Sequence, residues 1–265
     1  MKSRGFLMIK LENVYFSYEN KEILKNISFK IKKKEKIVLL GINGSGKSTL
    51  LKIINGLLFP QKGKYFYKGV EINKKQLKNK KFNKKFRKEV VFLFQNPDSM
   101  IFNPTVYDEI AFGLRQLGDK NEDIDEKVKY WAEKLGVYKY LNEPPFNLSG
   151  GEKQKVCLAA LLILEPEVLL LDEPTANLDP KTTGWLIDFL YELNLTTIIT
   201  THNLSLSLEL GDRGLVLSED HQIIYDGNLE EFVRDVEMLK KAGLVHIHRH
   251  RHGKLEHRHY HTHDF

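Results

Sequence analysis

The sequence predicts an α/β fold built around a parallel β-sheet. Short apolar runs alternate with longer helical patterns, and one such run passes through a glycine-rich loop into a helix. Apolar residues make up 42% of the 265 residues, which is ordinary for a globular chain. The longest apolar run, Val156–Leu164, is shorter than the roughly 20 residues that a membrane-spanning helix needs. The single cysteine excludes an internal disulfide and suits a reducing cytoplasm.

The elements can be assigned in chain order. Near the N-terminus, Ile9–Phe16 and Ile23–Ile31 alternate apolar and polar residues, as half-buried strands do. Continuous apolar runs, expected as buried parallel strands, follow at Ile37–Leu40, Val90–Phe94 and Val168–Leu171. A further strand, rich in β-branched residues, is expected at Thr196–Thr200. Helical spacing is found at Ser48–Ile54, Val106–Tyr140 (with a break near Gly118) and Gly151–Leu164.

A phosphate-binding loop is predicted between the strand that ends at Leu40 and the helix that follows it. Residues Gly41–Ser48 fit the pattern G-x-x-x-x-G-K-[ST], in which glycines let backbone N–H groups approach phosphates closely. The helix N-terminus adds positive potential at the same place. Lys47 can reach the β- and γ-phosphates, and Ser48 can offer its hydroxyl to Mg²⁺. The residues expected to bind the phosphates are Asn43, Gly44, Gly46, Lys47, Ser48 and Thr49.

Two acidic residues follow the apolar run Val168–Leu171. Asp172 lies at the carboxyl end of the expected strand, where it can hold Mg²⁺ through water. Glu173 is placed to polarise an attacking water as a general base. Acidic residues at a strand end are usually just solvated, so this pair becomes informative only together with the phosphate loop.

The segment Leu148–Glu152 precedes the long apolar helix and contains Ser149, Gly150 and Gly151. Two interpretations stay open for it. Its backbone N–H groups form a second anion-binding nest, or Ser149 simply caps the helix.

Taken in order, the motifs resemble those of the ATPase subunits of ABC transporters, over about residues 6–235. The matching segments are Tyr18, the phosphate loop Gly41–Thr49, the glutamine loop from Gln95, the signature Leu148–Glu152, the acid strand Val168–Glu173, the turn Asn177–Pro180 and the switch histidine His202. The resemblance implies a P-loop NTPase (RecA-like) core with an antiparallel β subdomain and an α-helical signature subdomain. It implies an ATPase domain at 1–240, with the helical subdomain inserted at about 97–155, and a histidine-rich tail at 241–265.

The resemblance also implies how ATP is bound and hydrolysed. Two such subunits, identical or paralogous, form a head-to-tail dimer, with ATP between the phosphate loop of one and the signature of the other. The further residues implied to bind the nucleotide are Tyr18, which stacks on adenine, Ser149, Gly151 and Asp179. Catalysis is implied for Lys47, Gln95, Glu173, which activates water, and His202, which stabilises transition-state charge. The implied Mg²⁺ ligands are Ser48, Gln95 and Asp172.

The segment Gln95–Gly113 is similar to the energy-coupling factor branch of the family, which powers uptake of vitamins and transition metals. Met100 departs from the glutamine that is typical of that branch. The branch implies a membrane coupling subunit that docks on this segment and a substrate-binding membrane subunit. The protein is then peripheral, on the cytoplasmic face of the cell membrane.

Eight histidines lie beyond Val245, in two blocks that both read His-x-His-x-His-x-His: His246, His248, His250 and His252, then His257, His259, His261 and His263. In an extended chain, a period of two puts the imidazoles of a block on one side. Neutral imidazoles suit Ni²⁺, Co²⁺ and Zn²⁺. The tail therefore favours a cobalt or nickel importer over a vitamin importer, while a disordered, solvated tail stays an alternative.

Other function classes remain as alternatives. A vitamin importer of the same branch fits every nucleotide motif. A soluble, non-transport ABC ATPase that acts on DNA or the ribosome is supported only by the lysine run Lys74–Lys88, which is more simply a solvated face, and no nucleic-acid partner is expected. A metal-storage protein would leave the nucleotide motifs unexplained.

Overall fold

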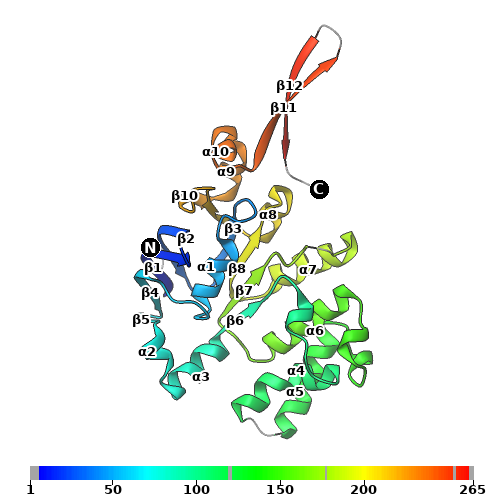
Figure 1. Ribbon diagram of the computed structural model, residues 1–265. Helices are drawn as coiled ribbons and strands as arrows, with labels where there is room; N and C mark the ends of the chain where they lie inside the picture. The colour runs from blue at the N-terminus through cyan, green and yellow to red at the C-terminus, as the bar shows by residue number, and fades with distance from the viewer. Residues whose placement is uncertain (1–5, 119–120, 177, 253–254, 263–265) are drawn as a thin grey trace, which may run out of the picture. The chain divides into compact units, whose positions relative to one another are not determined.

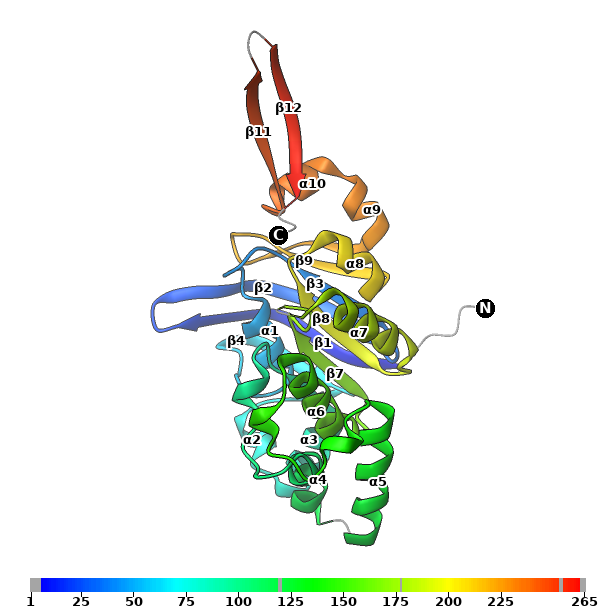
Figure 2. The same ribbon diagram turned by 90° about the vertical axis from the view of Figure 1, so that its right-hand side faces the viewer.

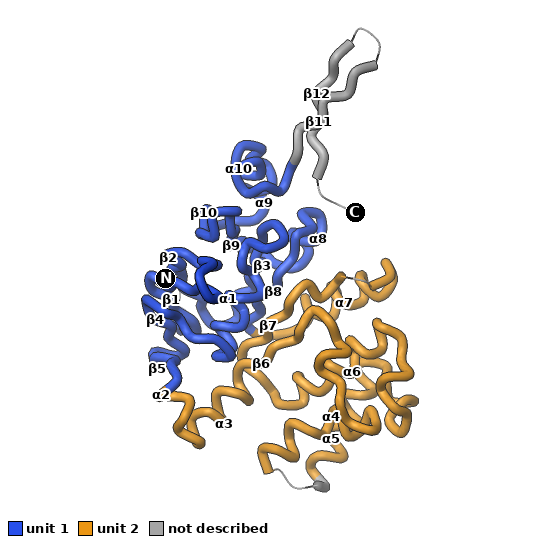
Figure 3. Tube along the Cα trace, in the orientation of Figure 1, with its two compact units in different colours: residues 1–74, 196–265 blue, residues 75–195 orange. Residues whose placement is uncertain are grey.

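The computed structural model describes residues 6–118, 121–176, 178–252 and 255–262, and at 121–122 and 246–262 it describes the backbone alone. The chain forms two compact units (Figure 3). Unit 1 comprises residues 1–74 and 196–265, and unit 2 comprises residues 75–195.

Unit 1 contains an antiparallel sheet with the strand order β2-β1-β4-β5. Its strands are β1 (Leu7–Tyr18), β2 (Lys21–Lys32), β4 (Lys62–Tyr67) and β5 (Val70–Glu71). The long strands β1 and β2 run side by side (Figure 2). Along β2, the alternate residues Ile27, Phe29 and Ile31 are buried and those between them are exposed, so the period of two in the sequence produces a one-sided sheet.

Unit 1 also holds the strands that carry the phosphate loop, in the order β10-β9-β3-β8 (Figure 1). Strand β3 (Lys36–Leu40) pairs in parallel with β8 (Thr196–Thr201) on one side and with β9 (Arg213–Leu217) on the other. Strand β10 (Ile223–Asn228) runs antiparallel to β9. Every residue of β8 is buried, as expected of a central strand rich in β-branched residues. The helices of unit 1 are α1 (Lys47–Ile54), α8 (Leu204–Leu210), α9 (Leu229–Arg234) and α10 (Val236–Lys241).

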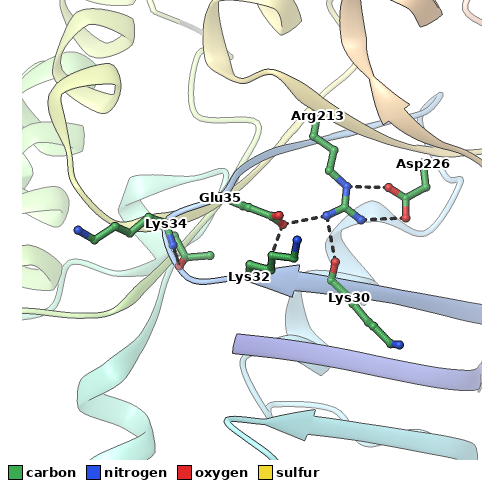
Figure 4. A network of polar contacts seen from close by, with 7 residues as sticks. Lys30, Lys32, Lys34, Glu35, Arg213 and Asp226 are labelled. Carbon is green, nitrogen blue, oxygen red and sulfur yellow. Dashed lines mark hydrogen bonds and ion pairs between the residues drawn. The ribbon is translucent and has the colours of Figure 1, made fainter. Parts of the chain in front are cut away.

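One arginine joins the antiparallel sheet to the strands that carry the phosphate loop (Figure 4). Arg213, at the start of β9, donates from Nε and Nη2 to the carboxylate of Asp226 on β10, at 2.7 and 2.9 Å. Its Nη1 donates to Glu35 at 2.8 Å and to the carbonyl oxygen of Lys30, on β2, at 3.0 Å. Because Glu35 directly precedes β3, the guanidinium fixes the point where the chain enters the phosphate-loop strand.

Unit 2 combines a parallel strand pair with a helical region. Strand β6 (Val90–Leu93) pairs in parallel with β7 (Val168–Asp172). The helices are α3 (Lys80–Glu89), α4 (Val106–Leu117), α5 (Asn121–Lys134), α6 (Gly150–Leu162) and α7 (Pro180–Glu192), and the short α2 (Lys74–Leu77) lies where the two units join in sequence. Thr105 caps α4 by accepting from the N–H of Asp108, and Gly118 ends it in the left-handed conformation at φ 73°.

The chain beyond α10 forms an antiparallel ribbon of β11 (Val245–His252) and β12 (Leu255–Thr262), labelled in Figure 1. His263 lies outside the described residues.

The α/β class predicted from the sequence is confirmed, together with the parallel strands and the antiparallel sheet. The predicted helical stretch Val106–Tyr140 is divided at Gly118 into α4 and α5 and ends in a 3₁₀ turn at Tyr138–Tyr140. Among the described residues, no helix has the length and apolar character needed to cross a membrane.

Candidate functional site

The phosphate loop takes a conformation that depends on its glycines. Gly41, Gly44 and Gly46 have φ values of 153°, 84° and 110°. A Cβ at Gly46 would lie 2.6 Å from the carbonyl oxygen of Ile23, so a side chain there would need both a disfavoured φ and a backbone shift. Helix α1 begins immediately afterwards, at Lys47.

Lys47 is held inside the loop that it follows. Its Nζ donates to the carbonyl oxygens of Gly41 at 2.7 Å and Ile42 at 3.2 Å, and the residue is only 6% exposed. A cation at the N-terminus of a helix, ringed by glycines in positive φ, fits a polyphosphate anion. The chain's own residues therefore suit the phosphates of ATP, and the hydroxyl of Ser48, next to Lys47, is an oxygen group of the kind that Mg²⁺ binds.

His202 lies at the same edge of the sheet as the phosphate loop. In the parallel pairing, Leu40 of β3 is opposite Thr201 of β8, so the phosphate loop and His202 each leave the sheet at the same level. Tyr18 ends β1, pairs with Lys21 at the start of β2 and is 43% exposed, with its ring 4.9 Å from that of Phe16. Ile23, two residues after Lys21 on β2, lies against Gly46 of the phosphate loop. Tyr18 therefore lies at the end of the antiparallel sheet that is nearest the loop.

His221, in unit 1, also contacts the phosphate loop, and no sequence motif indicated it. The Nδ1 of His221 lies 3.1 Å from the carbonyl oxygen of Ser45, inside the phosphate loop. His221 occupies a turn between β9 and β10, with φ 65°. A lone histidine in a polar turn carries no local signal, because its neighbour in space lies far away in the sequence.

Unit 2 brings three of the predicted residues to one edge. Leu93 of β6 is opposite Leu171 of β7, so Asp172 at the end of β7, Glu173 after it and Gln95 after β6 all lie at the same edge of the parallel pair. Asp172 and Glu173 are 5% and 6% exposed. Glu173 has φ 45°, and its carbonyl oxygen accepts from the N–H of Ala176 at 3.1 Å, which turns the chain sharply after the strand.

A cavity of about 440 Å³ in unit 2 lies between the segment that begins at Gln95 and the start of α6. Its lining residues are Gln95, Asn96, Pro97, Asp98, Gly150, Gln154, Ala176 and Leu178. Lys153 pairs with Asp98 at 2.7 Å, and Gln154 donates to the carbonyl oxygen of Pro174 at 2.7 Å, so α6 contacts both segments that border this cavity. Burial raises the pKa of the Cys157 thiol to about 12, which keeps it protonated.

The larger cavity in unit 1, of about 980 Å³, lies elsewhere. It is lined by parts of β1, β2 and β4 with Arg213 and Asp226, and no residue of the phosphate loop borders it. Size alone does not identify the nucleotide site.

Ser149 caps α6 in a complete capping box. Its hydroxyl accepts from the N–H of Glu152, while the Glu152 carboxylate accepts from the Ser149 N–H at 2.9 Å and from its hydroxyl at 2.7 Å. The hydroxyl of Tyr140 also donates to Glu152. Together these hydrogen bonds lower the pKa of Glu152 to about 2, and the bond from Tyr140 has the largest effect. The interpretation of Ser149 as the cap of α6 is thus confirmed. The neighbouring Gly150 and Gly151 take no part in the capping box.

Asp179 caps the next helix. Its carboxylate accepts from the N–H groups of Lys181 and Thr182, both at 3.0 Å, at the start of α7. Hydrogen bonds from Thr182 and the backbone lower the pKa of this carboxyl. The preceding Asn177, part of the predicted turn, lies outside the described residues.

The segment after Gln95 is held by one buried carboxylate. Glu109 accepts from the N–H groups of Phe102 at 3.0 Å and Asn103 at 2.8 Å. The Sδ of Met100 accepts from the N–H of Phe94 at 3.4 Å, so methionine has a polar contact where glutamine is usual. Phe102 and Phe112 are 65% and 37% exposed and meet edge to face at 4.8 Å, whereas Val106 is buried.

Comparison with known proteins decides the family. The model of the family described as ABC transporter matches residues 24–176. A putative ABC transporter ATP-binding protein of Clostridium acetobutylicum is 43% identical over 90% of this chain and 100% of its own length. The chain is an ABC transporter ATP-binding subunit. It has the ABC ATPase fold and is an ATP hydrolase coupled to transport, and ABC ATPases use ATP and Mg²⁺.

Two further relatives are more specific. An energy-coupling factor transporter ATP-binding protein, EcfA, of Methanocaldococcus jannaschii is 41% identical over 89% of this chain and 85% of its own. The structure of cbiO1 from Clostridium perfringens, described as part of the ABC transporter complex cbiONQ, matches with a TM-score of 0.76 at 32% identity. That match covers 90% of this chain and 95% of cbiO1. ABC ATPases of this kind typically act as dimers with membrane partners.

Proposed function

We propose that this subunit belongs to an energy-coupling factor importer and that its ATPase cycle drives uptake of cobalt or nickel ions. The importer class is supported by the likeness to EcfA and to the subunit of the cbiONQ complex. The choice of cargo depends on one observation, the histidine-rich sequence beyond Val245. Imidazole nitrogens are suitable ligands for these borderline divalent ions, which favours a metal cargo over a vitamin.

The residues already described have distinct roles in this proposal. Two ATPase subunits enclose ATP between them. Its phosphates bind to the phosphate loop and Lys47 of one subunit, and to Ser149 and Gly151 of the other subunit. Tyr18 stacks on adenine, and Asp179 lies near the dimer interface. Glu173 accepts a proton from the attacking water, and His202 donates a hydrogen bond to the charge that develops on the γ-phosphate.

Metal ligation belongs to the same site. Ser48, Asp172 and Gln95 would hold Mg²⁺, which when bound neutralises negative charge on the phosphates. The buried carboxylate of Asp172 ends β7 and the exposed amide of Gln95 follows its parallel partner β6, which suits oxygen ligation of a hard cation.

A membrane coupling subunit would dock on the segment Gln95–Gly113. Exposed aromatic side chains are frequent anchors at interfaces, and Phe102 and Phe112 form such a pair on α4 and the loop before it. The backbone under Phe102 is fixed by Glu109, so this surface is preorganised. The subunit then works at the cytoplasmic face of the cell membrane.

The experiment is elemental analysis of cells that carry the wild-type protein or Glu173→Gln. We expect Glu173→Gln to lower the cellular content of cobalt or nickel selectively, because bound ATP is no longer hydrolysed. The matched control is Glu192→Gln, an exposed carboxyl at the end of α7, which should leave both metals unchanged. If Glu173→Gln changes neither metal, the cargo is not cobalt or nickel, and a vitamin becomes the leading cargo.

A further inference from the structure

The ribbon at the C-terminal end aligns the two histidine blocks against each other. In the register of β11 and β12, His246 is opposite His261, His248 is opposite His259, and His250 is opposite His257. The sequence alone shows two separate blocks. The pairing makes them one array of three cross-strand histidine pairs.

All three pairs lie on the same face of the ribbon. Successive residues of a strand belong to opposite faces, and the paired histidines are spaced by two along both strands. The arginines belong to the other face, where Arg249 is opposite Arg258 and Arg251 is opposite Glu256. One face is therefore histidine-rich and the other contains the cationic residues.

The spacing suits chelation by several imidazoles at once. Directly opposite residues in an antiparallel pair have Cβ atoms about 4.5–5.5 Å apart, and next-but-one residues on a strand are about 6.5 Å apart. Two neighbouring pairs thus put four histidines at adjacent register positions on one face of the ribbon. Four nitrogen ligands satisfy the tetrahedral or square-planar preference of Zn²⁺, Ni²⁺ or Cu²⁺.

We propose that this face of the ribbon is a transition-metal site assembled from both strands and centred on the pair His248/His259. The central pair belongs to either possible set of four, with His246/His261 or with His250/His257, so one ion binds tightly per chain. His252 is opposite Leu255 and contributes little. Only the identity of the physiological ion depends on the proposed function, because binding itself is a property of the ribbon.

Metal binding also stabilises the ribbon in this proposal. An isolated two-stranded hairpin is marginally stable in water, and like charges directly opposite each other, as in Arg249/Arg258, weaken it further. An ion held by both strands favours the paired form over the separated strands. The ribbon is then a sensor, paired when metal is present and loose when it is scarce.

The test uses the purified full-length chain and Ni²⁺ alone, with affinity measured by competition against a chromophoric chelator. A variant with all eight tail histidines replaced by asparagine defines the background from the rest of the chain. His248→Asn and His259→Asn should each lower Ni²⁺ affinity about tenfold or more, since even outer-sphere changes at metal sites cost about 10- to 100-fold. The matched control, His252→Asn, removes one histidine from the same block and face and should change affinity less than about threefold.

The double variant His248→Asn/His259→Asn separates a shared site from independent blocks. In a shared site the two substitutions are coupled: the double variant loses less binding free energy than the sum of the two single losses, because each histidine acts only together with its partner across the strands. Trypsin cleavage within the tail should also be slowed by Ni²⁺ in the wild type and not in the double variant. The proposal is overturned if His252→Asn weakens binding as much as His248→Asn, or if the two central substitutions act additively. A vitamin cargo would contradict the proposed function and leave these results unchanged.

Discussion

At the scale of single residues, Glu152 shows how one substitution in a signature motif acts. It stands where the commonest signature has glutamine, and its carboxylate accepts hydrogen bonds from Ser149 and Tyr140. Ser149 is also the residue proposed to contact the partner's nucleotide. In that proposal, the negative charge of Glu152 lies beside the hydroxyl that approaches the phosphate, so we expect Glu152 to influence the affinity of the signature for ATP.

The pKa of Glu152 predicts a pH-dependent contribution to stability. Its folded value of about 2 is below the ordinary value of 4.5, so the charged form stabilises the fold above about pH 4.5. That contribution decreases as the pH falls from 4.5 toward 2. We expect Glu152→Gln to lower the free energy of unfolding by about 1 kcal/mol at pH 7 and by less at pH 4. Urea unfolding at both pH values measures this, and a difference that stays constant would contradict it.

Lys47 offers the most direct test of the nucleotide site. Its ammonium is held inside the loop by the carbonyl oxygens of Gly41 and Ile42, and in the proposed function it binds the phosphates of ATP. We expect Lys47→Ala to weaken ATP binding by about 10- to 100-fold, equivalent to about 1.5–3 kcal/mol for lost charge-assisted hydrogen bonds. A fluorescent ATP analogue measures the affinity. Lys52→Ala, in the last turn of the same helix, is the control and should bind like the wild type.

At the scale of elements, the loop before α4 depends on Glu109. Its carboxylate accepts from two backbone N–H groups and from the side chain of Asn103. Glu109→Ala should lower the free energy of unfolding by about 2 kcal/mol, because those donors lose their acceptor in a partly buried place. Glu133→Ala, an exposed position on α5, should change it by less than about 0.5 kcal/mol. Urea denaturation compares the two, and equal effects would show that Glu109 does not hold the loop.

The elements that the sequence predicted best are those with strong local signals. Strand β3, the phosphate loop and α1 followed from a buried apolar run, glycines and a helix start, and the alternation in β1 and β2 was equally clear. The short strands β4 and β5 carry little local pattern, since they are defined by pairing with β1. The contact of His221 with the phosphate loop and the pairing of Lys153 with Asp98 join residues far apart in sequence, and no periodicity encodes them.

The pairing of the two histidine blocks is a further contact that local sequence patterns do not encode. The period of two predicted that the histidines of each block belong to one side of an extended chain. This prediction concerns a single strand and does not depend on a partner strand. The register between blocks depends on the turn and on the opposite strand. A shift by one residue would place histidines opposite arginines, so the alignment is a property of the ribbon and not of either block.

At the scale of the whole molecule, the residues proposed to handle one ATP are distributed over both compact units and over two copies of the chain. Glu173→Gln should retain ATP binding, abolish turnover and accumulate as an ATP-bound dimer, because closure is no longer followed by hydrolysis. Size-exclusion chromatography with ATP and Mg²⁺, together with phosphate release, measures both effects. Phosphate release at the wild-type rate would exclude Glu173 as the general base.

Unit 1 is built from two distant parts of the chain, and this affects how the protein is made. Strand β3 leads into the phosphate loop, yet its neighbours β8 and β9 begin only at Thr196 and Arg213. A ribosome adds about 5–20 residues per second, so Leu40 emerges about 8–30 s before Thr201. During that interval the apolar strand β3 has not yet paired with β8 and β9, so it is accessible to aggregation and to chaperones. Nucleotide binding is therefore acquired late in synthesis, and a ribosome-stalled fragment ending before residue 196 would carry the complete phosphate-loop sequence without the strands that hold it in place.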